Sequence, residues 1–294
     1  MTTKRTFIFA LMILLVYARG WSQDIDKMLE DATGSSTEYT TATFKSTRII
    51  NGHSIERMPE GQLDFRISHR FGELKTGAYN LWGLDQANIH FGLEYGITDW
   101  VMVGLGRGTY EKTYDGFLKF SLLRQSKGDR NMPVSVSLLG SVAYNTLKWE
   151  GEGTLNKWDR MSYVAQLLVS RKFNERFSLE INPTYVHRNM VDTELDPNDL
   201  LSLGAGLRFK LTRRFSFNAE YYYVLPPLHD YRSAKTYNPL SVGVDIETGG
   251  HVFTIMLTNS LAMIEKGFVG ETTGNWPDGG IHLGFNISRV FTLK

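Results

Sequence analysis

The sequence predicts an all-β protein, built as an antiparallel up-and-down transmembrane β-barrel of about 12 strands. Three observations predict this fold. Apolar and polar residues alternate over many stretches of the chain, short and long links alternate between those stretches, and aromatic residues gather at the ends of the stretches. Together these features are typical of barrels that cross a membrane with their strands.

The alternation is clearest over residues 200–225. Leu201 and Leu203 belong to one series of every second residue, and Ser202 and Gly204 belong to the other. Successive side chains of a strand point to opposite faces of a sheet, so each arm has an apolar face and a polar face. Each arm also reaches the ~9–11 residues that a tilted membrane-spanning strand requires.

The same pattern of period two recurs along the chain and predicts twelve strands. Single-chain bacterial barrels have an even number of strands, which agrees with this count. The predicted strands cover residues 63–71, 89–97, 101–105, 118–122, 134–144, 161–169, 177–185, 201–211, 215–223, 240–246, 253–257 and 281–287.

The links between these strands alternate in length, as periplasmic turns and external loops do in outer-membrane barrels. A soluble sandwich has no reason to sort its links in this way. The short links are residues 97–99, 174–175, 213–214 and 249–250, and the long ones are 73–86, 147–158, 189–199, 226–238 and 261–279.

The alternative is a soluble β-sandwich, in which the apolar face would be packed inside. The polar series favours the barrel because it is rich in Ser, Gly, Asn and Thr, which suit a narrow interior better than a water-exposed surface. The aromatic residues at strand ends resemble the girdles found at membrane interfaces. We therefore expect the apolar series to face lipid and the polar series to face a lumen.

The N-terminal part predicts export and a separate segment before the barrel. Residues 1–22 are a predicted signal peptide, with Lys4 and Arg5 before an apolar run at 7–18. Residues 23–60 are a predicted N-terminal segment, periplasmic or lumen-lining, and residues 61–294 are the predicted outer-membrane barrel. Whether residues 40–51 add a strand stays open, because their polar residues do not suit a lipid-facing one.

Composition narrows the function. The net charge of +1 favours no nucleic acid partner, and the absence of cysteine excludes disulfides, thiolate metal sites and a cysteine nucleophile. The acidic residues 192–199 lack the glycine and the ligand order of a calcium-binding loop. We expect no metal, no cofactor and no catalytic residue, since no G-x-S-x-G elbow or triad spacing occurs.

The polar series carries charges of both signs that are the candidate lumen-lining residues. Unpaired charges are costly in a narrow interior, so a network of ion pairs tying strands together is one interpretation. A filter that selects a small polar solute is the other. For the network, Arg208 or Lys210 with Glu220 is the leading predicted pair. The candidates are Asp64, Arg66, Arg70, His90, Glu94, Lys119, Glu180, Arg208, Lys210, Glu220, Asp245, Glu247 and His282.

These observations lead to two functional hypotheses and argue against an enzyme. The first is a narrow channel or transporter for a small solute, because twelve strands lie between the filled eight-stranded barrel and the open porin. The alternative is a plugged structural or docking barrel that binds a periplasmic or outer-membrane partner protein through its loops. Outer-membrane lipid is the other expected partner.

Four strings also resemble a known family. They are FKSTRIINGHS at 44–54, ISHRFG at 67–72, EYGITD at 94–99 and GGHVF at 249–253. The chain resembles a domain-of-unknown-function family described as a membrane-bound β-barrel of Bacteroidota-type Gram-negative bacteria. The resemblance implies a barrel in the outer membrane and implies no catalytic residue, ligand or reaction.

Overall fold

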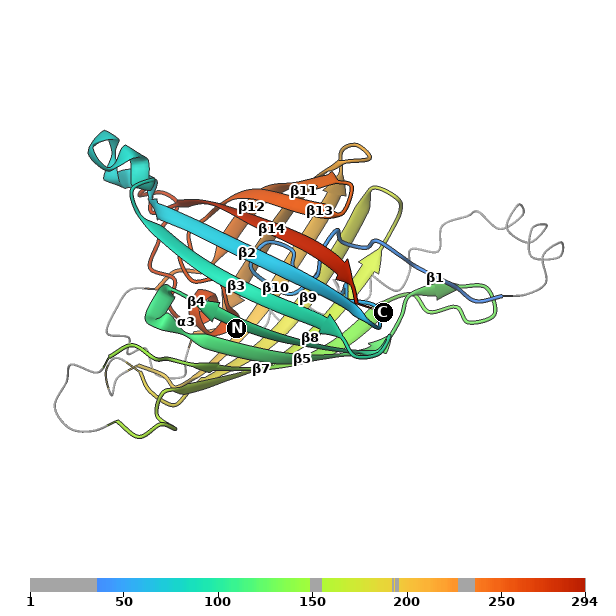
Figure 1. Cartoon of the computed structure of the whole chain (residues 1–294), viewed down its shortest axis with the longest axis horizontal. Coiled ribbons are helices and arrows are strands. Elements are labelled where there is room, and N and C mark those ends of the chain that lie inside the picture. The colour runs from blue at the N-terminus through green and yellow to red at the C-terminus, as the bar shows by residue number, and fades with distance from the viewer. Residues whose placement is uncertain (1–35, 149–154, 192, 194–195, 227–235, 294) are drawn as a thin grey trace, which may run out of the picture. The chain divides into compact units, whose positions relative to one another are not determined.

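In the computed structural model, twelve strands close into an antiparallel β-barrel (Figure 1). The structure describes residues 36–148, 155–191, 193, 196–226 and 236–293, so the predicted signal peptide lies outside the described residues. The barrel belongs to the larger of two compact units, which comprises Tyr39–Ser126 and Met132–Lys294. The predicted fold class and strand number are confirmed.

Each predicted strand overlaps one barrel strand, with ends that differ by up to five residues. Neighbours in the chain pair in antiparallel fashion, and β14 pairs with β2 to close the barrel. The barrel strands are β2 (Gln62–Glu73), β3 (Ala87–Gly96), β4 (Val101–Gly108), β5 (Tyr114–Leu123), β7 (Ser135–Tyr144), β8 (Met161–Lys172), β9 (Phe177–Arg188), β10 (Asp199–Lys210), β11 (Phe215–Val224), β12 (Leu240–Thr248), β13 (His251–Thr258) and β14 (His282–Thr292).

The remaining described elements are short. β1 (Glu38–Tyr39) and β6 (Ser126–Lys127) form a separate two-stranded sheet. None of the helices within the described residues is long and apolar enough to cross a membrane. These helices are η1 (Leu74–Thr76), η2 (Ala78–Gly83), η3 (Tyr110–Lys112) and α3 (Glu265–Gly270).

Most links sort by length between the two ends of the barrel, as predicted. The exceptions are the short link 109–113 between β4 and β5 and the long link 124–134 between β5 and β7. We call the end that carries the tight turns after β3, β8, β10 and β12 the short-turn end, and the opposite end the long-loop end. The turn after β12 shows why glycine is needed there. Gly249 and Gly250 have φ values of +29° and +108°, which two-residue hairpin turns require and which other residues adopt only with strain.

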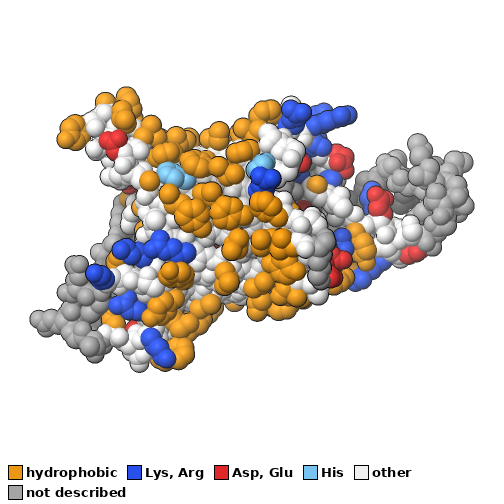
Figure 2. All heavy atoms as spheres, viewed as in Figure 1, with side chains coloured by type: hydrophobic (Ala, Val, Ile, Leu, Met, Phe, Trp, Pro, Cys, Tyr) orange, Lys and Arg blue, Asp and Glu red, His pale blue; other side chains and the backbone are white. Residues whose placement is uncertain are grey.

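The apolar series faces outward, as expected for a barrel in lipid. In β10, Leu201 and Leu203 are 55% and 49% exposed, whereas Ser202 between them is 4% exposed. Hydrophobic side chains cover much of the barrel wall in Figure 2. A soluble sandwich would bury its apolar residues and expose its polar ones, so the alternative of a soluble β-sandwich is excluded.

The lumen is filled from within the chain. Residues 40–60, which we call the plug segment, run inside the barrel (Figure 1). A second insertion, residues 259–281 between β13 and β14, contains α3 and is here called the inner loop. Five of the six residues of α3 are buried. The interior is less polar than we predicted, because inward-facing apolar residues pack against both insertions. Examples are Leu168 and Met256 against the plug segment, and Val186 and Tyr222 against the inner loop.

Candidate functional site: the filled lumen

The plug segment enters and leaves the lumen at the short-turn end. At its start, the backbone N–H of Thr40 donates to the carbonyl of Gln125 over 2.8 Å. Just after its end, the N–H of Gly61 donates to the carbonyl of Gly96 over 3.0 Å. Both contacts are beside short-turn links, so the segment is a re-entrant loop. It adds no strand to the barrel.

The tip of the plug segment is held by Glu220 of β11. This carboxylate accepts the backbone N–H groups of Ile50, Asn51 and Gly52, at 3.2, 2.8 and 3.1 Å. Arg70 of β2 adds a bond of 2.7 Å from its guanidinium to the side-chain oxygen of Asn51. Backbone amides that would otherwise lose water on burial therefore find a charged acceptor.

The tip of the plug segment approaches β11 closely, which explains why a glycine, Gly52, follows Asn51. A Cβ atom on Gly52 would lie 1.9 Å from the hydroxyl oxygen of Tyr222. Any other residue at this position would push the tip away from β11. The structure therefore requires glycine here because of a close contact with Tyr222.

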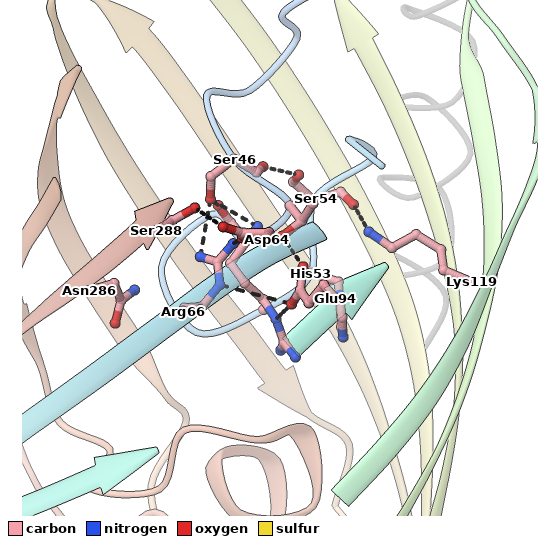
Figure 3. A network of polar contacts seen from close by, with 12 residues as sticks. Ser46, His53, Ser54, Asp64, Arg66, Glu94, Lys119, Asn286 and Ser288 are labelled. Atoms are coloured by element: carbon pink, nitrogen blue, oxygen red, sulfur yellow. Dashed lines mark hydrogen bonds and ion pairs between the residues drawn. The ribbon is translucent and has the colours of Figure 1, made fainter. Parts of the chain in front are cut away.

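A network of ion pairs joins the plug segment to β2 and β3 (Figure 3). Arg66 donates to Asp64 over 2.8 Å and to the hydroxyl of Thr47 over 2.6 Å. Glu94 accepts a hydrogen bond from Thr47 and lies 3.6 Å from the Nε of Arg48. Each charge in this buried set therefore has an opposite charge or a hydroxyl as partner, as burial requires.

Two further candidates hold the second half of the plug segment. The ammonium of Lys119 on β5 donates to the carbonyls of Ser54 and Glu56, at 3.0 and 2.7 Å. Glu180 on β9 accepts the N–H of Ile55 over 2.6 Å. These charged side chains therefore bind the backbone of the plug segment rather than each other.

The predicted pair of Arg208 or Lys210 with Glu220 is wrong. The register of β10 and β11 places Arg208 opposite Asn218, and it places Glu220 opposite Gly206, which has no side chain. Gly206 instead leaves room for the plug segment, whose backbone amides occupy Glu220. Arg208 donates to Ser216 over 3.1 Å and to the carbonyl of Ala42 over 2.7 Å.

The other candidates divide between the interior and the rim. Asp245 is buried and accepts from Asn218 and Thr254, at 2.6 and 2.7 Å. Glu247 and Lys210 lie at the short-turn rim and are only partly buried, because the lumen opens there; Glu247 pairs with Lys45 of the plug segment.

The two histidines among the candidates, His90 and His282, are buried near the long-loop end. His90 lies 2.7 Å from the carboxylate of Asp115, and His282 lies 2.8 Å from the backbone carbonyl of Phe71. Among the described residues, no group of three or more His, Asp and Glu side chains is placed to hold a metal ion.

Sequence reasoning missed the inner loop as a part of the interior. Glu265 of α3 pairs with Arg48 of the plug segment over 2.9 Å, so the two insertions are joined in the lumen. Phe268 is fully buried, and its ring centre lies 4.9 Å from that of Tyr222. The available signal was an apolar Phe268-Val269 pair within a long link, which solvent would not favour.

At the long-loop end, above α3, a cavity of about 180 Å³ remains. We call it the vestibule and define it by Glu111, Asp159, Arg160, Arg188, Lys266 and Glu271, with Met190 and Leu200 on its apolar side. Lys266 forms ion pairs with Glu111 and, over 2.7 Å, with Glu271. The Nη1 of Arg188 lies 3.8 Å from Glu271.

The electrostatics of the vestibule follow from partial burial of opposite charges. Burial raises the pKa of Glu271, although Lys266 acts against this shift. Burial lowers the pKa of Lys266, but Glu271 and Glu111 outweigh it and the net shift is upward. Lys266 therefore stays cationic, and the raised pKa of Glu271 means that it is protonated more readily than an ordinary glutamate.

The chain matches known barrels in sequence pattern and in fold. The model of the family described as "Membrane bound beta barrel domain (DUF5777)" matches residues 44–291. No curated protein sequence matches the chain.

Solved structures with a similar fold include one outer membrane channel and two porins. The COG4313 outer membrane channel from Pseudomonas putida F1 has 14% identity and a TM-score of 0.48, over 81% of this chain and 98% of that one. The NanC porin has 10% identity and a TM-score of 0.47, over 79% and 99%. The KdgM porin has 6% identity and a TM-score of 0.45, over 79% and 99%.

The match of the family model over most of the chain agrees with the closed barrel and with its outward apolar face. The chain belongs to the DUF5777 family of membrane-bound β-barrel domains and is an integral β-barrel of the outer membrane.

Proposed function

We propose that this barrel is a narrow, gated channel or transporter for a small polar solute, closed in the described conformation by the plug segment. The single observation that carries the proposal is how the plug segment is held. Its contacts with the wall include many hydrogen bonds and ion pairs to polar side chains, such as those of Glu220, Lys119 and Arg66. Water can replace each of these partners, so the wall suits a hydrated path once the segment moves.

The topology supports movement of the plug segment as a unit. Because it enters and leaves at the same end, it can withdraw toward the periplasmic side without threading through the barrel. We assign the short-turn end to the periplasm on the length of the links. The proposal assigns no enzymatic activity to the barrel.

The test is to lock the plug segment to the wall. A Cβ atom on Gly206 of β10 lies 3.5 and 3.6 Å from the Cγ1 and Cγ2 of Ile49, which puts the two Cβ atoms at a separation that a disulfide can span. The native chain has no cysteine, so Ile49→Cys with Gly206→Cys introduces one defined pair.

We expect the oxidised double variant to pass small solutes at least about tenfold more slowly than its reduced form, in liposome flux or planar-bilayer recordings. Each single variant should not respond to reductant. Equal flux in the oxidised and reduced double variant, with the disulfide shown to have formed, would contradict gating by this segment. Silence of the wild-type protein toward ions and small metabolites would contradict the channel itself.

One observation favours the alternative docking function. The link after β2 exposes apolar side chains at the long-loop end, with Tyr79, Leu81 and Trp82 being 94%, 53% and 55% exposed. A partner protein that co-purifies in fixed ratio with the wild-type chain, and is lost on Trp82→Ser, would support docking. Its absence from gently solubilised membranes would count against it.

A further inference from the structure

The vestibule combines features of a built binding site rather than of an open loop surface. Five separate links converge on it, and its lining brings both signs of charge next to an apolar wall. Arg188 and Lys266 are 9% and 8% exposed, so both are held in place by packing. Its volume would take roughly six water molecules at ~30 Å³ each, which is the size of a small organic solute.

The internal pairing of the vestibule leaves hydrogen-bonding capacity of both kinds. Within the described residues, the Nε of Arg188 and the Oε2 of Glu271 are buried and have no hydrogen-bond partner. One is a cationic donor and the other an anionic acceptor, on side chains whose nearest charged atoms are 3.8 Å apart. Arg160 adds a guanidinium that donates to the carbonyls of Asn145 and Leu147, at 3.3 and 2.6 Å.

This pairing points to the charge of the ligand. Glu271 and Glu111 would repel an anion, and Arg188 and Lys266 would repel a cation. A solute with a carboxylate next to an ammonium satisfies both sides, because its carboxylate can accept hydrogen bonds from the guanidinium of Arg188 and its ammonium can donate to the carboxylate of Glu271. Met190 and Leu200 leave an apolar wall for a short hydrocarbon part.

We propose that the vestibule binds a small zwitterion, an α-amino acid with a short aliphatic side chain, through Arg188 and Glu271. The proposal rests on the proposed function, because it makes this solute the one that the barrel admits. The solute's carboxylate faces Arg188 and Arg160, its ammonium faces Glu271, and its side chain lies along Leu200.

The test uses three probes with one four-carbon skeleton. L-2-Aminobutanoate is the zwitterion, butanoate is the anion, and 2-butylamine is the cation. Calorimetric titration of each into the full-length protein in detergent should give saturable binding of the zwitterion alone. Butanoate or 2-butylamine binding as tightly as the zwitterion would overturn the proposal, as would no saturable binding of the zwitterion by folded wild-type protein.

The variants are chosen to separate charge from structure. Glu271→Gln keeps the shape and removes the charge, and we expect it to weaken zwitterion binding at least about tenfold, which corresponds to the loss of one charge-assisted hydrogen bond. Arg188→Gln should do the same. Heat-modifiable gel migration shows whether Arg188→Gln folds. If it does not, Arg188→Lys is the replacement variant: it keeps the positive charge but loses the planar guanidinium with its paired N–H donors, and we expect it to bind the zwitterion with intermediate affinity.

Glu175→Gln is the matched control. Glu175 also pairs with a lysine, Lys172 at 2.9 Å, but it lies in a turn at the opposite end of the barrel. Unchanged affinity in Glu271→Gln, or equal loss in Glu175→Gln, would overturn the proposed role of the vestibule residues.

The outcomes also separate this inference from the channel function. Zwitterion binding without any flux of L-2-aminobutanoate through liposomes would uphold the site and contradict the proposed function. Flux of small solutes with no preference for the zwitterion would uphold the channel and contradict the site.

Discussion

At the scale of single residues, the lumen is organised by charged side chains that bind backbone. Glu220 accepts three successive N–H groups of the plug segment, and Lys119 donates to two of its carbonyls. An ionised acceptor forms stronger hydrogen bonds than a neutral one, so each of these side chains holds several residues of the segment at once.

Glu220→Gln is therefore expected to loosen the tip of the plug segment by about 2 kcal/mol, because a neutral amide with one oxygen replaces a carboxylate. Hydrogen exchange of the amides of Ile50, Asn51 and Gly52 should accelerate roughly thirty-fold for that change in free energy. Glu73→Gln, which removes an ion pair with Lys75 and leaves the plug segment's contacts in place, is the control. Unchanged exchange at the three amides would show that Glu220 does not hold the tip.

Binding of the zwitterion should depend on pH through Glu271. Burial raises the pKa of this carboxyl above 4.5, so acidification protonates it earlier than an ordinary glutamate and removes the negative charge that holds the ammonium. The charged groups that face it are Lys266, Glu111 and Arg188. We expect the affinity for L-2-aminobutanoate to fall as pH decreases, with a midpoint above 4.5.

Calorimetric titrations at a series of pH values measure this dependence. The Glu271→Gln protein should show a flatter profile, because the titrating group is gone. A wild-type profile as flat as that of the variant would refute the assignment to Glu271.

At the scale of elements, two insertions close one lumen from opposite ends. The plug segment comes from the short-turn end and the inner loop from the long-loop end, and the Arg48–Glu265 ion pair joins them. The inner loop is anchored by Phe268, which packs on Tyr222 and lies in one apolar cluster with residues of β8–β11.

Phe268→Ala should release the inner loop, since removing a buried aromatic ring costs about 3–5 kcal/mol when the site cannot collapse. Lys266 lies two residues before Phe268, so trypsin cleavage after Lys266 reports the release directly. We expect faster cleavage at this bond than in the wild-type protein. Phe291→Ala, at an exposed position in β14, is the control, and equal cleavage rates in all three proteins would contradict the anchor role.

At the scale of the whole molecule, stability follows from which side of the wall a residue occupies. Leu203 is near the middle of β10 and faces outward, whereas Leu211 follows β10 at the short-turn end and is also outward and exposed. The cost of a charge on the lipid face depends on depth, because only the hydrocarbon centre lacks water.

Leu203→Arg is expected to destabilise the folded barrel by about 2–4 kcal/mol and Leu211→Arg by about 0–1 kcal/mol. Urea unfolding in liposomes, followed by tryptophan fluorescence, measures both. Equal losses for the two variants would contradict the membrane position of the wall.

The sequence predicted the wall well because the signal is local. The alternation of Leu201, Ser202 and Leu203 involves only adjacent residues, so it predicts the strand, its two faces and, by repetition, the number of strands. Link lengths are also read from short stretches of sequence, and most of them distinguish the short-turn end of the barrel from the long-loop end. The buried polar candidates followed from the same series, since a residue's parity in a strand decides its side.

The partners of those candidates were not predictable in this way. Glu220 is 170 residues from Ile50 in the chain, and its contact depends on the barrel register and on how deep the plug segment reaches. The predicted Arg208–Glu220 pair failed for that reason. The vestibule was also missed, because most of its residues come from links that carry no periodic pattern.

By itself, the sequence determined that this protein is a twelve-stranded outer-membrane barrel with apolar residues outside, because neighbouring residues encode strand, face and turn. Only the tertiary structure decided that the lumen is filled, which charges meet and where a cavity is left. Those outcomes depend on contacts between distant segments, whose geometry exists only after the barrel has closed.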